Sequence, residues 1–231
     1  MPFIGNKPSA VPLTSADIAD GIITSAKIVD GTIVNADINA SAAIASTKLS
    51  GVTSDFVLLA STDASSSASV SFDGYFSATY RNYKITISNL IVASDNTALR
   101  MRFRRSNADL TDSYYVHILD AAYINSSSAS AGDQLNTGWN QAQFTLNIGG
   151  VDNTDVLSST NIDLLLYNPF GGTTKSICTF IGTNNSSDAL YFYSFNGAGV
   201  YTNGTTALSG VSFFSSSGNL ASGNFKLYGI K

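Results

Sequence analysis

The hydrophobic pattern of the first fifty residues has an unusual period of five. An α-helix repeats its apolar positions about every 3.6 residues and a half-buried strand every two residues, so neither element fits. The pattern instead predicts a wound ribbon that returns one apolar side chain to a common axis every five residues. The side chains of this expected stem core are Ile18, Ile23, Ile28, Ile33 and Ile38.

Turn residues interrupt this repeat at ten-residue intervals. Asp20-Gly21 and Asp30-Gly31 favour turns and leave room for at most one helical turn between them. A single ribbon has no second layer on which to bury its isoleucines, since repeat units bury their apolar faces by stacking on neighbours. We therefore expect further copies of the same chain around the axis, with about 1.5–3 kcal/mol gained for each buried isoleucine. The pattern alone does not fix the number of copies.

After residue 38 the pattern changes to one that favours a helix. A 4-3-4 spacing, typical of a short coiled-coil seam, links Ile38, Ala42, Ala45 and Leu49. The segment is rich in alanine, and Gly51 follows it at the position of a helix C-cap glycine. We expect a short helical neck with Leu49 in the same core as the isoleucines. Alternatively, the alanines continue the wound stem.

From about residue 52 the pattern becomes typical of β-strands. Residues 99–104 alternate strictly, with apolar side chains on one face and arginines on the other. Many short strands with polar turns predict an all-β sandwich or jelly roll. The apolar run 162–166 should be a central strand, and the last run should fix the C-terminus in a sheet. The other runs are 56–60, 69–76, 83–87, 114–123, 142–148, 176–181, 190–195, 211–214 and 225–230.

These patterns divide the chain into three regions. Residues 1–14 form a leader with three prolines, which block regular structure. Residues 15–51 form the repeat stem and its neck, and residues 52–231 form a β-rich head. The expected fold is therefore all-β, with a C-terminal β-sandwich or jelly-roll-like head preceded by a short interwound stem.

Composition and charge narrow the range of functions. The 231 residues are 44% hydrophobic, enough for a sizeable core, but only 12% charged, so the surface must be rich in Ser, Thr, Asn and Gly. A net charge of -4 argues against nucleic-acid binding, which depends on neutralising phosphates. The lone cysteine cannot form an internal disulfide, and no apolar run is long enough to span a membrane.

Catalytic motifs are nearly absent, and we expect no enzyme activity, metal site or cofactor. His117, the only histidine, lies within a predicted strand and is not accompanied by a Gly-x-Ser-x-Gly motif. Cys178 alternates with apolar neighbours and is expected in the core. The aspartates lie mostly in predicted loops, where their side chains favour turns. A pair of carboxylates that hydrolyses glycosides is the alternative.

Two groups of side chains are candidates for binding. The arginines Arg100, Arg102 and Arg104 can line a solvated sheet face, pair with acids across a subunit contact, or bind an anionic ligand. Exposed aromatic rings among amide and hydroxyl groups are typical of sugar-binding sites, although the same residues are frequent in cores and interfaces. The ligand-binding candidates, led by Trp139 in an expected loop, are Trp139, Tyr191, Tyr193 and Tyr201.

Several segments resemble the fibre proteins of tailed bacteriophages. The opening Ile4-Gly5-Asn6-Lys7-Pro8 and the repeat of residues 16–38 are similar to fibre stems, and residues 43–49 resemble the short neck that ends them. The closing residues 223–230 are similar to the last strand of a β-rich fibre head. The stem motif covers about a fifth of the chain, and the head resemblance is one of composition.

This resemblance implies a homotrimer on the surface of a virion. The head would bind a glycan or another receptor on the host cell, without nucleic-acid binding or membrane insertion. The N-terminus would dock on other virion proteins through Ile4, Gly5, Asn6 and Pro8. The alternatives are a fibre or cement protein on the capsid, a polysaccharide-degrading head and a bacterial surface adhesin.

Overall fold

The computed structural model describes residues 14–39, 41–44, 48, 55–124, 136–147, 151, 159–172, 174–186, 191–204 and 206–231. The chain divides into two compact units, one ending at Thr53 and the other beginning at Ser54. We call them the repeat segment and the head. The expected docking residues Ile4, Gly5, Asn6 and Pro8 lie outside the described residues, so virion docking stays a prediction.

The repeat segment alternates two kinds of turn every ten residues. Asp-Gly turns contain Gly21 and Gly31 at φ of 78° and 79°, a left-handed backbone that glycine adopts without strain. Between the turns lies one turn of 3-10 helix per unit. This confirms the turns predicted from the Asp-Gly pairs. The helical turns are η1 (Ser15–Asp17), η2 (Ser25–Lys27) and η3 (Asn35–Asp37).

Side-chain hydrogen bonds close two of these helical turns. The backbone N–H and the hydroxyl of Thr14 both donate to the Asp17 carboxylate, at 2.8 and 2.7 Å. These bonds from Thr14 lower the pKa of Asp17. In the third unit the Val34 N–H donates to Asp37 at 2.9 Å. The middle unit has Lys27 at this position, which has no acceptor atom for such a bond.

The isoleucines of the repeat are exposed in the single chain. Every described side chain between residues 14 and 44 is exposed. The stem core expected from the period of five is therefore not formed within one chain, and assembly with further copies stays a prediction. The exposed fractions are 39% for Ile18, 55% for Ile23, 40% for Ile28, 55% for Ile33 and 41% for Ile38.

The expected helical neck is wrong for residues 41–44, whereas Lys48 lies in a 3-10 turn and the rest of the neck lies outside the described residues. Residues 41–44 form a turn and irregular backbone. The side-chain oxygen of Asn39 accepts the Ser41 N–H at 2.8 Å, and its carbonyl accepts the Ala42 N–H at 2.8 Å. Such local bonds compete with helix formation. Leu49, the last expected core residue of the stem, lies outside the described residues.

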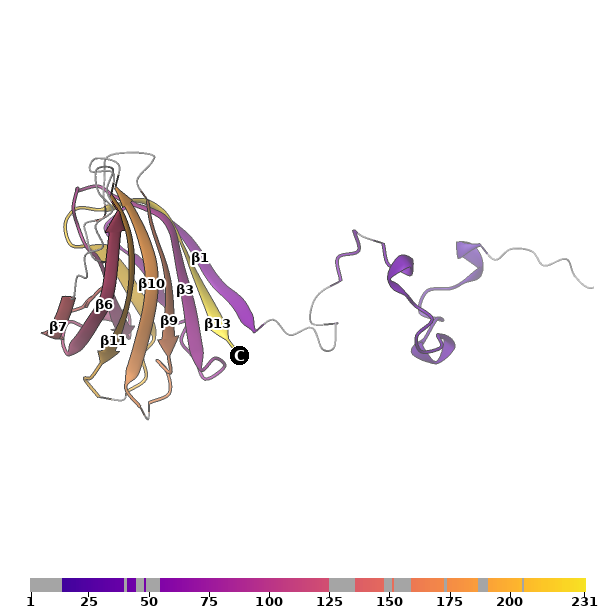
Figure 1. Ribbon diagram of the computed structural model, residues 1–231. Coiled ribbons are helices and arrows are strands. Elements are labelled where there is room, and N and C mark those ends of the chain that lie inside the picture. Colours follow the sequence, from indigo (N-terminus) through magenta and orange to yellow (C-terminus); the bar gives the residue numbers. More distant parts are fainter. Residues whose placement is uncertain are drawn as a thin grey trace, which may run out of the picture. The chain divides into compact units, whose positions relative to one another are not determined.

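The head consists of two antiparallel β-sheets, which confirms the all-β class (Figure 1). The large sheet has the strand order β1-β13-β3-β9-β10-β11-β6-β7, and the small sheet has the order β2-β12-β4-β5, with β8 also paired to β4. The jelly-roll connectivity stays a prediction. The strands are β1 (Phe56–Ser67), β2 (Val70–Asp73), β3 (Asn82–Val92), β4 (Leu99–Arg105), β5 (Ala108–Asp109), β6 (Tyr114–Ile124), β7 (Asn136–Gln141), β8 (Phe144–Thr145), β9 (Ser159–Tyr167), β10 (Ser176–Ser186), β11 (Tyr191–Tyr201), β12 (Gly210–Ser215) and β13 (Leu220–Ile230).

One hydrophobic core lies between the two sheets. Alternate residues of β3 and β9 point into it, and so do those of β4 in the small sheet, as expected for strands with one buried face. Cys178 is fully buried there, as predicted. The run 162–166 lies in β9 between β3 and β10, and β13 lies between β1 and β3, so both predicted placements are confirmed.

Several predicted strand boundaries are wrong: the expected strand 56–60 continues to Ser67, and of the described residues in the run 142–148 only Phe144–Thr145 form a strand. Residues 182–186 lie beyond the expected strand 176–181 but belong to β10, where residues 182–185 pair with both β9 and β11 and Ser186 pairs with β11. Asn184 is buried in this extension and accepts a hydrogen bond from the Thr160 hydroxyl at 3.0 Å. Trp139 lies in the edge strand β7 rather than in a loop. Both segments are rich in Asn, Thr and Gly, so cross-strand pairing, and not local propensity, makes them strands.

Candidate functional site

The outer face of the large sheet, on the side away from the core, carries an unusual row of apolar side chains. Adjacent strands pair in register, so that one outward side chain from each strand lines up with the next. Of the seven paired residues only Asn82 is neither apolar nor aromatic. We call this line the apolar row, and across the sheet it consists of Tyr115, Val200, Ile177, Tyr167, Asn82, Ile230 and Phe56.

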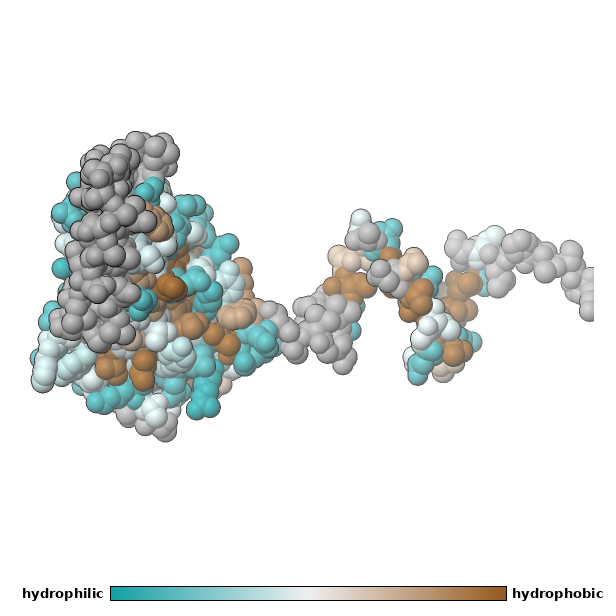
Figure 2. Space-filling model, in the orientation of Figure 1, coloured by the Kyte–Doolittle hydropathy of each residue, from teal (hydrophilic) through white to brown (hydrophobic). Residues whose placement is uncertain are grey.

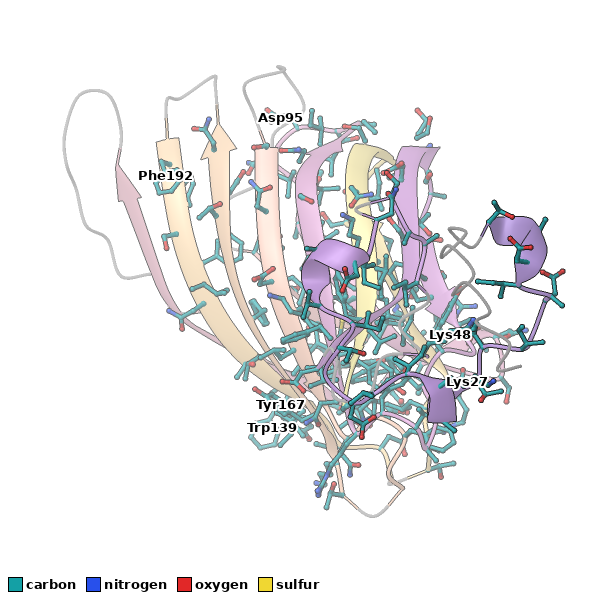
Figure 3. The ribbon with its side chains drawn as sticks, turned by 90° about the vertical axis from the view of Figure 1, so that its right-hand side faces the viewer. Lys27, Lys48, Asp95, Trp139, Tyr167 and Phe192 are labelled. Atoms are coloured by element: carbon teal, nitrogen blue, oxygen red, sulfur yellow. The ribbon has the colours of Figure 1, made fainter. Side chains whose placement is uncertain are left out.

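The outer face becomes polar with distance from this row. The next row is mixed and includes Leu165 and Leu58, whereas Thr183 and Asn161 form part of a polar row farther along the strands. Figure 2 shows hydrophobic residues gathered over the large sheet among hydrophilic ones. In Figure 3, Tyr167 lies at one end of the strands and Phe192 at the opposite end. The face is therefore apolar mainly at the end where β1 begins.

A bulge in β1 places two large side chains on this face. The register with β13 shifts between Leu58 and Ala60, so that one extra residue is inserted. Before the bulge, Phe56 and Leu58 point outward and are 50% and 54% exposed. After it, Ala64 points into the core and is 5% exposed. A single strand thus contributes to the outer face at one end and to the core at the other.

Phe56 is one of the residues that line a shallow hollow of about 550 Å³ on the outer face, which we call the outer hollow. Its apolar lining includes Phe56, Leu165 and Ile181, and Ile181 is 60% exposed. Two charged residues also line it, and Lys84 donates to the Asp163 carboxylate at 2.9 Å. The two charges neutralise each other, so the hollow presents an apolar surface without net charge.

Trp139 is the most exposed large hydrophobic side chain that the structure describes, with an exposed fraction of 79%. Its ring centroid lies 5.8 Å from that of Tyr115 on the neighbouring strand β6, and the rings are inclined by 52°. Asn140 follows with φ of 49°, and the Gln141 side-chain amide donates to the Trp139 carbonyl at 2.8 Å. Two aromatic faces therefore lie beside amide groups at the β7 edge of the large sheet.

The other predicted ligand-binding residues do not join this site. Tyr201 is only 1% exposed, and its ring packs 5.0 Å from that of Tyr114 in the core, so it is not available to a surface ligand. Tyr193 lies on the same strand and is half-buried. Eight residues separate it from Tyr201, a distance of about 26 Å along an extended strand. The side chain of Tyr191 lies outside the described residues. The sequence analysis missed Tyr115 because the contact depends on the pairing of β6 with β7.

Two arginines of β4, Arg102 and Arg104, pair with acids of their own chain. Arg104 donates to Asp73 at 3.0 Å and to Asp109 at 2.6 Å, and its side chain is only 17% exposed. Arg102 lies over the Phe214 ring, 4.6 Å from its centroid. Neither a solvated face nor pairing across a subunit contact describes these two side chains. They instead bind β4 to the neighbouring strands of the small sheet and to β5.

This arrangement also shifts the ionisation of one acid. Partial burial raises the pKa of Asp73, but hydrogen bonds from the Ser209 hydroxyl at 2.7 Å and from Arg104 outweigh it. The pKa of Asp73 therefore lies below its ordinary value. The charged network serves the stability of the small sheet.

The remaining chemistry of the described residues is limited. Among them, no three His, Cys, Asp or Glu side chains converge in a way that could hold a metal ion. The described part of the chain also contains no helix of sufficient length and apolarity to cross a bilayer. The features that stand out are the exposed isoleucines of the repeat, the Trp139–Tyr115 pair and the outer hollow. Comparisons with protein-family models, with curated proteins and with solved structures found no match for this chain.

Proposed function

We propose that the protein is a trimeric virion fibre that attaches a bacteriophage to its host cell. Three repeat segments wind around one axis, and three heads contact a glycan on the cell surface. The observation that carries the proposal is the column of isoleucines at every fifth residue, all exposed in the single chain. The phage-fibre resemblance of the repeat supports the trimer and the virion location.

The exposed isoleucines can supply much of the free energy of assembly. Full burial of one such side chain gains about 1.5–3 kcal/mol, and about half of each is already covered in the single chain. Burying the rest gains roughly 1 kcal/mol per isoleucine, or about 15 kcal/mol for the fifteen isoleucines of a trimer. This gain must exceed the entropy lost on association, which is about 4–15 kcal/mol for each association step. Further contacts between the copies are therefore required.

The Trp139–Tyr115 pair supports a glycan as the receptor. Aromatic faces pack against the apolar C–H faces of sugar rings, and the neighbouring amides of Asn140 and Gln141 can hydrogen-bond to hydroxyl groups. A single site of this kind binds weakly. Three heads on one axis would convert weak contacts into strong avidity, provided that the receptors can be reached at the same time.

Oligomer mass provides the first test. Sedimentation equilibrium of the full chain should give three times the mass of the single chain. Changing Ile23, Ile28 and Ile33 together to Asp should give a monomer, because three charges would enter each buried column. The matched control is Val29→Asp with Val34→Asp, which are exposed apolar residues one position beyond the column. The proposal of a wound stem would be refuted if the variant with three aspartates is still a trimer. It would also be refuted if the wild-type chain is a monomer.

Tryptophan fluorescence provides the second test, since Trp139 is the only tryptophan. Polysaccharide purified from the host envelope should change the emission of Trp139 in a saturable manner. Isothermal titration calorimetry, which needs no tryptophan, compares the variants, and Trp139→Ala should weaken binding at least tenfold. Phe192→Ala is the matched control, because Phe192 is an exposed aromatic residue at the far end of the same face. Equal binding by both variants would remove Trp139 from the receptor site. Imaging of labelled particles would then distinguish a tail location from a capsid location.

A further inference from the structure

The outer hollow is not explained by the receptor site. It runs from Phe56 on β1, through Leu165 on β9 and Ile181 on β10, to Ala198 on β11. Trp139 lies on β7, two strands beyond β11, and neither Trp139 nor Tyr115 lines the hollow. The exposed apolar side chains of the hollow therefore need a different partner.

We propose that the outer hollow is the contact surface between heads, and that a second copy of this chain covers it. The inference rests on the proposed stem assembly and assigns the head its own interface. Phe56, the first residue of β1, belongs both to the apolar row and to the lining of the hollow. One member of this lining therefore follows the isoleucine column closely in the sequence.

The tether favours this partner over an unrelated protein. Ile44 and Phe56 are twelve residues apart, so the chain between them spans at most about 40 Å. Three repeat segments on one axis would hold three β1 edges within that reach of the axis. The local concentration of neighbouring heads is then in the millimolar range that short tethers produce. At such a concentration a neighbouring head would cover this patch even if the patch is too small to make untethered heads dimerise.

The charges of the hollow also suit a contact between identical copies. Lys84 and Asp163 are already paired within each head, so a facing copy meets no uncompensated charge. The other lining side chains are uncharged and, apart from Asn196, apolar or small, including Ala198 and Thr179. Trp139 lies on β7, two strands beyond the β11 end of the hollow, and is not part of its lining. A copy that covers the hollow can therefore leave Trp139 accessible to a receptor.

The test measures the solvent access of Ile181 in the full-length assembly. The variants Ile181→Cys and Phe192→Cys place a thiol at two outward positions that are 60% and 46% exposed in the single chain. The native Cys178 is fully buried and does not interfere. In the trimer, maleimide should label the Ile181→Cys variant at least tenfold more slowly than the Phe192→Cys variant. Circular dichroism and sedimentation confirm that each variant is folded and assembled.

Combining Ile181→Cys with the three isoleucine-to-Asp changes identifies what covers the site. In that monomer the thiol at position 181 should react as fast as the one at position 192. Slow labelling that persists in the monomer would overturn the proposal, because the chain's own residues would then cover the hollow. Fast labelling in a trimer would also overturn it while leaving the wound stem intact. A wild-type monomer would instead refute the stem assembly, so the two failures are distinguishable.

Discussion

The clearest stability prediction concerns two buried tyrosines that are neighbours in the core. The Tyr114 hydroxyl accepts the Phe103 N–H at 2.8 Å and donates to the Leu110 carbonyl at 3.0 Å. The ring centroid of Tyr201 lies 5.0 Å from that of Tyr114. The Tyr201 hydroxyl is buried and has no hydrogen-bond partner among the described residues. Changing either tyrosine to phenylalanine removes one oxygen and leaves the ring in place. The two substitutions nevertheless have different expected costs.

For Tyr114→Phe the free energy of unfolding should fall by about 1–3 kcal/mol, because the buried Phe103 N–H loses its acceptor. For a chain of this size that corresponds to a fall in Tm of about 2–4 °C per kcal/mol. Tyr201→Phe should leave the stability unchanged or raise it, since the lost hydroxyl makes no bond to a described residue.

Urea unfolding followed by far-UV circular dichroism measures both variants, at one protein concentration because assembly adds to the apparent stability. The wild-type chain is the reference for each substitution. Equal losses for Tyr114→Phe and Tyr201→Phe would refute the reasoning, since the hydrogen-bonded hydroxyl of Tyr114 would then contribute no more than the unbonded hydroxyl of Tyr201. A loss confined to Tyr201→Phe would refute it equally.

Three further predictions follow from the head. Gly182→Ala should lower the free energy of unfolding by about 1–3 kcal/mol in urea titrations, because the added Cβ would lie 2.5 Å from the Phe195 ring. Arg104→Gln should be most destabilising near neutral pH. The lowered pKa of Asp73 gives stability that is present above about pH 4 and is lost as pH falls through the folded pKa, so the two proteins should converge in acid. Burial raises the pKa of Cys178 to about 12, so Ellman's reagent at pH 8 should modify it only after unfolding.

Local sequence pattern was sufficient where one face of an element is strongly apolar. The central strand at residues 162–166 and the core position of Cys178 were predicted because apolar residues dominate their surroundings. The Asp-Gly turns of the repeat were predicted because only glycine adopts their backbone without strain. In each case the information lies within a few residues.

Features that depend on strand order were missed. Each strand contributes only one side chain to the apolar row, so the row exists only once seven strands are placed side by side. Tyr201 was expected at the surface, but it is buried in the core. The Phe144 ring packs against the same strand at Gly199, where a side chain would leave no room for it. The partners of Arg104 are Asp73 and Asp109, and Asp73 lies on a different strand 31 residues away.

The ten-residue unit of the repeat has a consequence for how such a chain can change length. Each unit closes its own turns through bonds between residues at most three positions apart, such as Lys27 N–H to the Thr24 carbonyl at 2.9 Å. One whole unit could therefore be removed or duplicated while every remaining turn keeps its bonds. Removing five residues would keep the isoleucine spacing but place a 3-10 turn where an Asp-Gly turn belongs. Lengthening and shortening by genetic duplication or deletion should thus proceed in steps of ten.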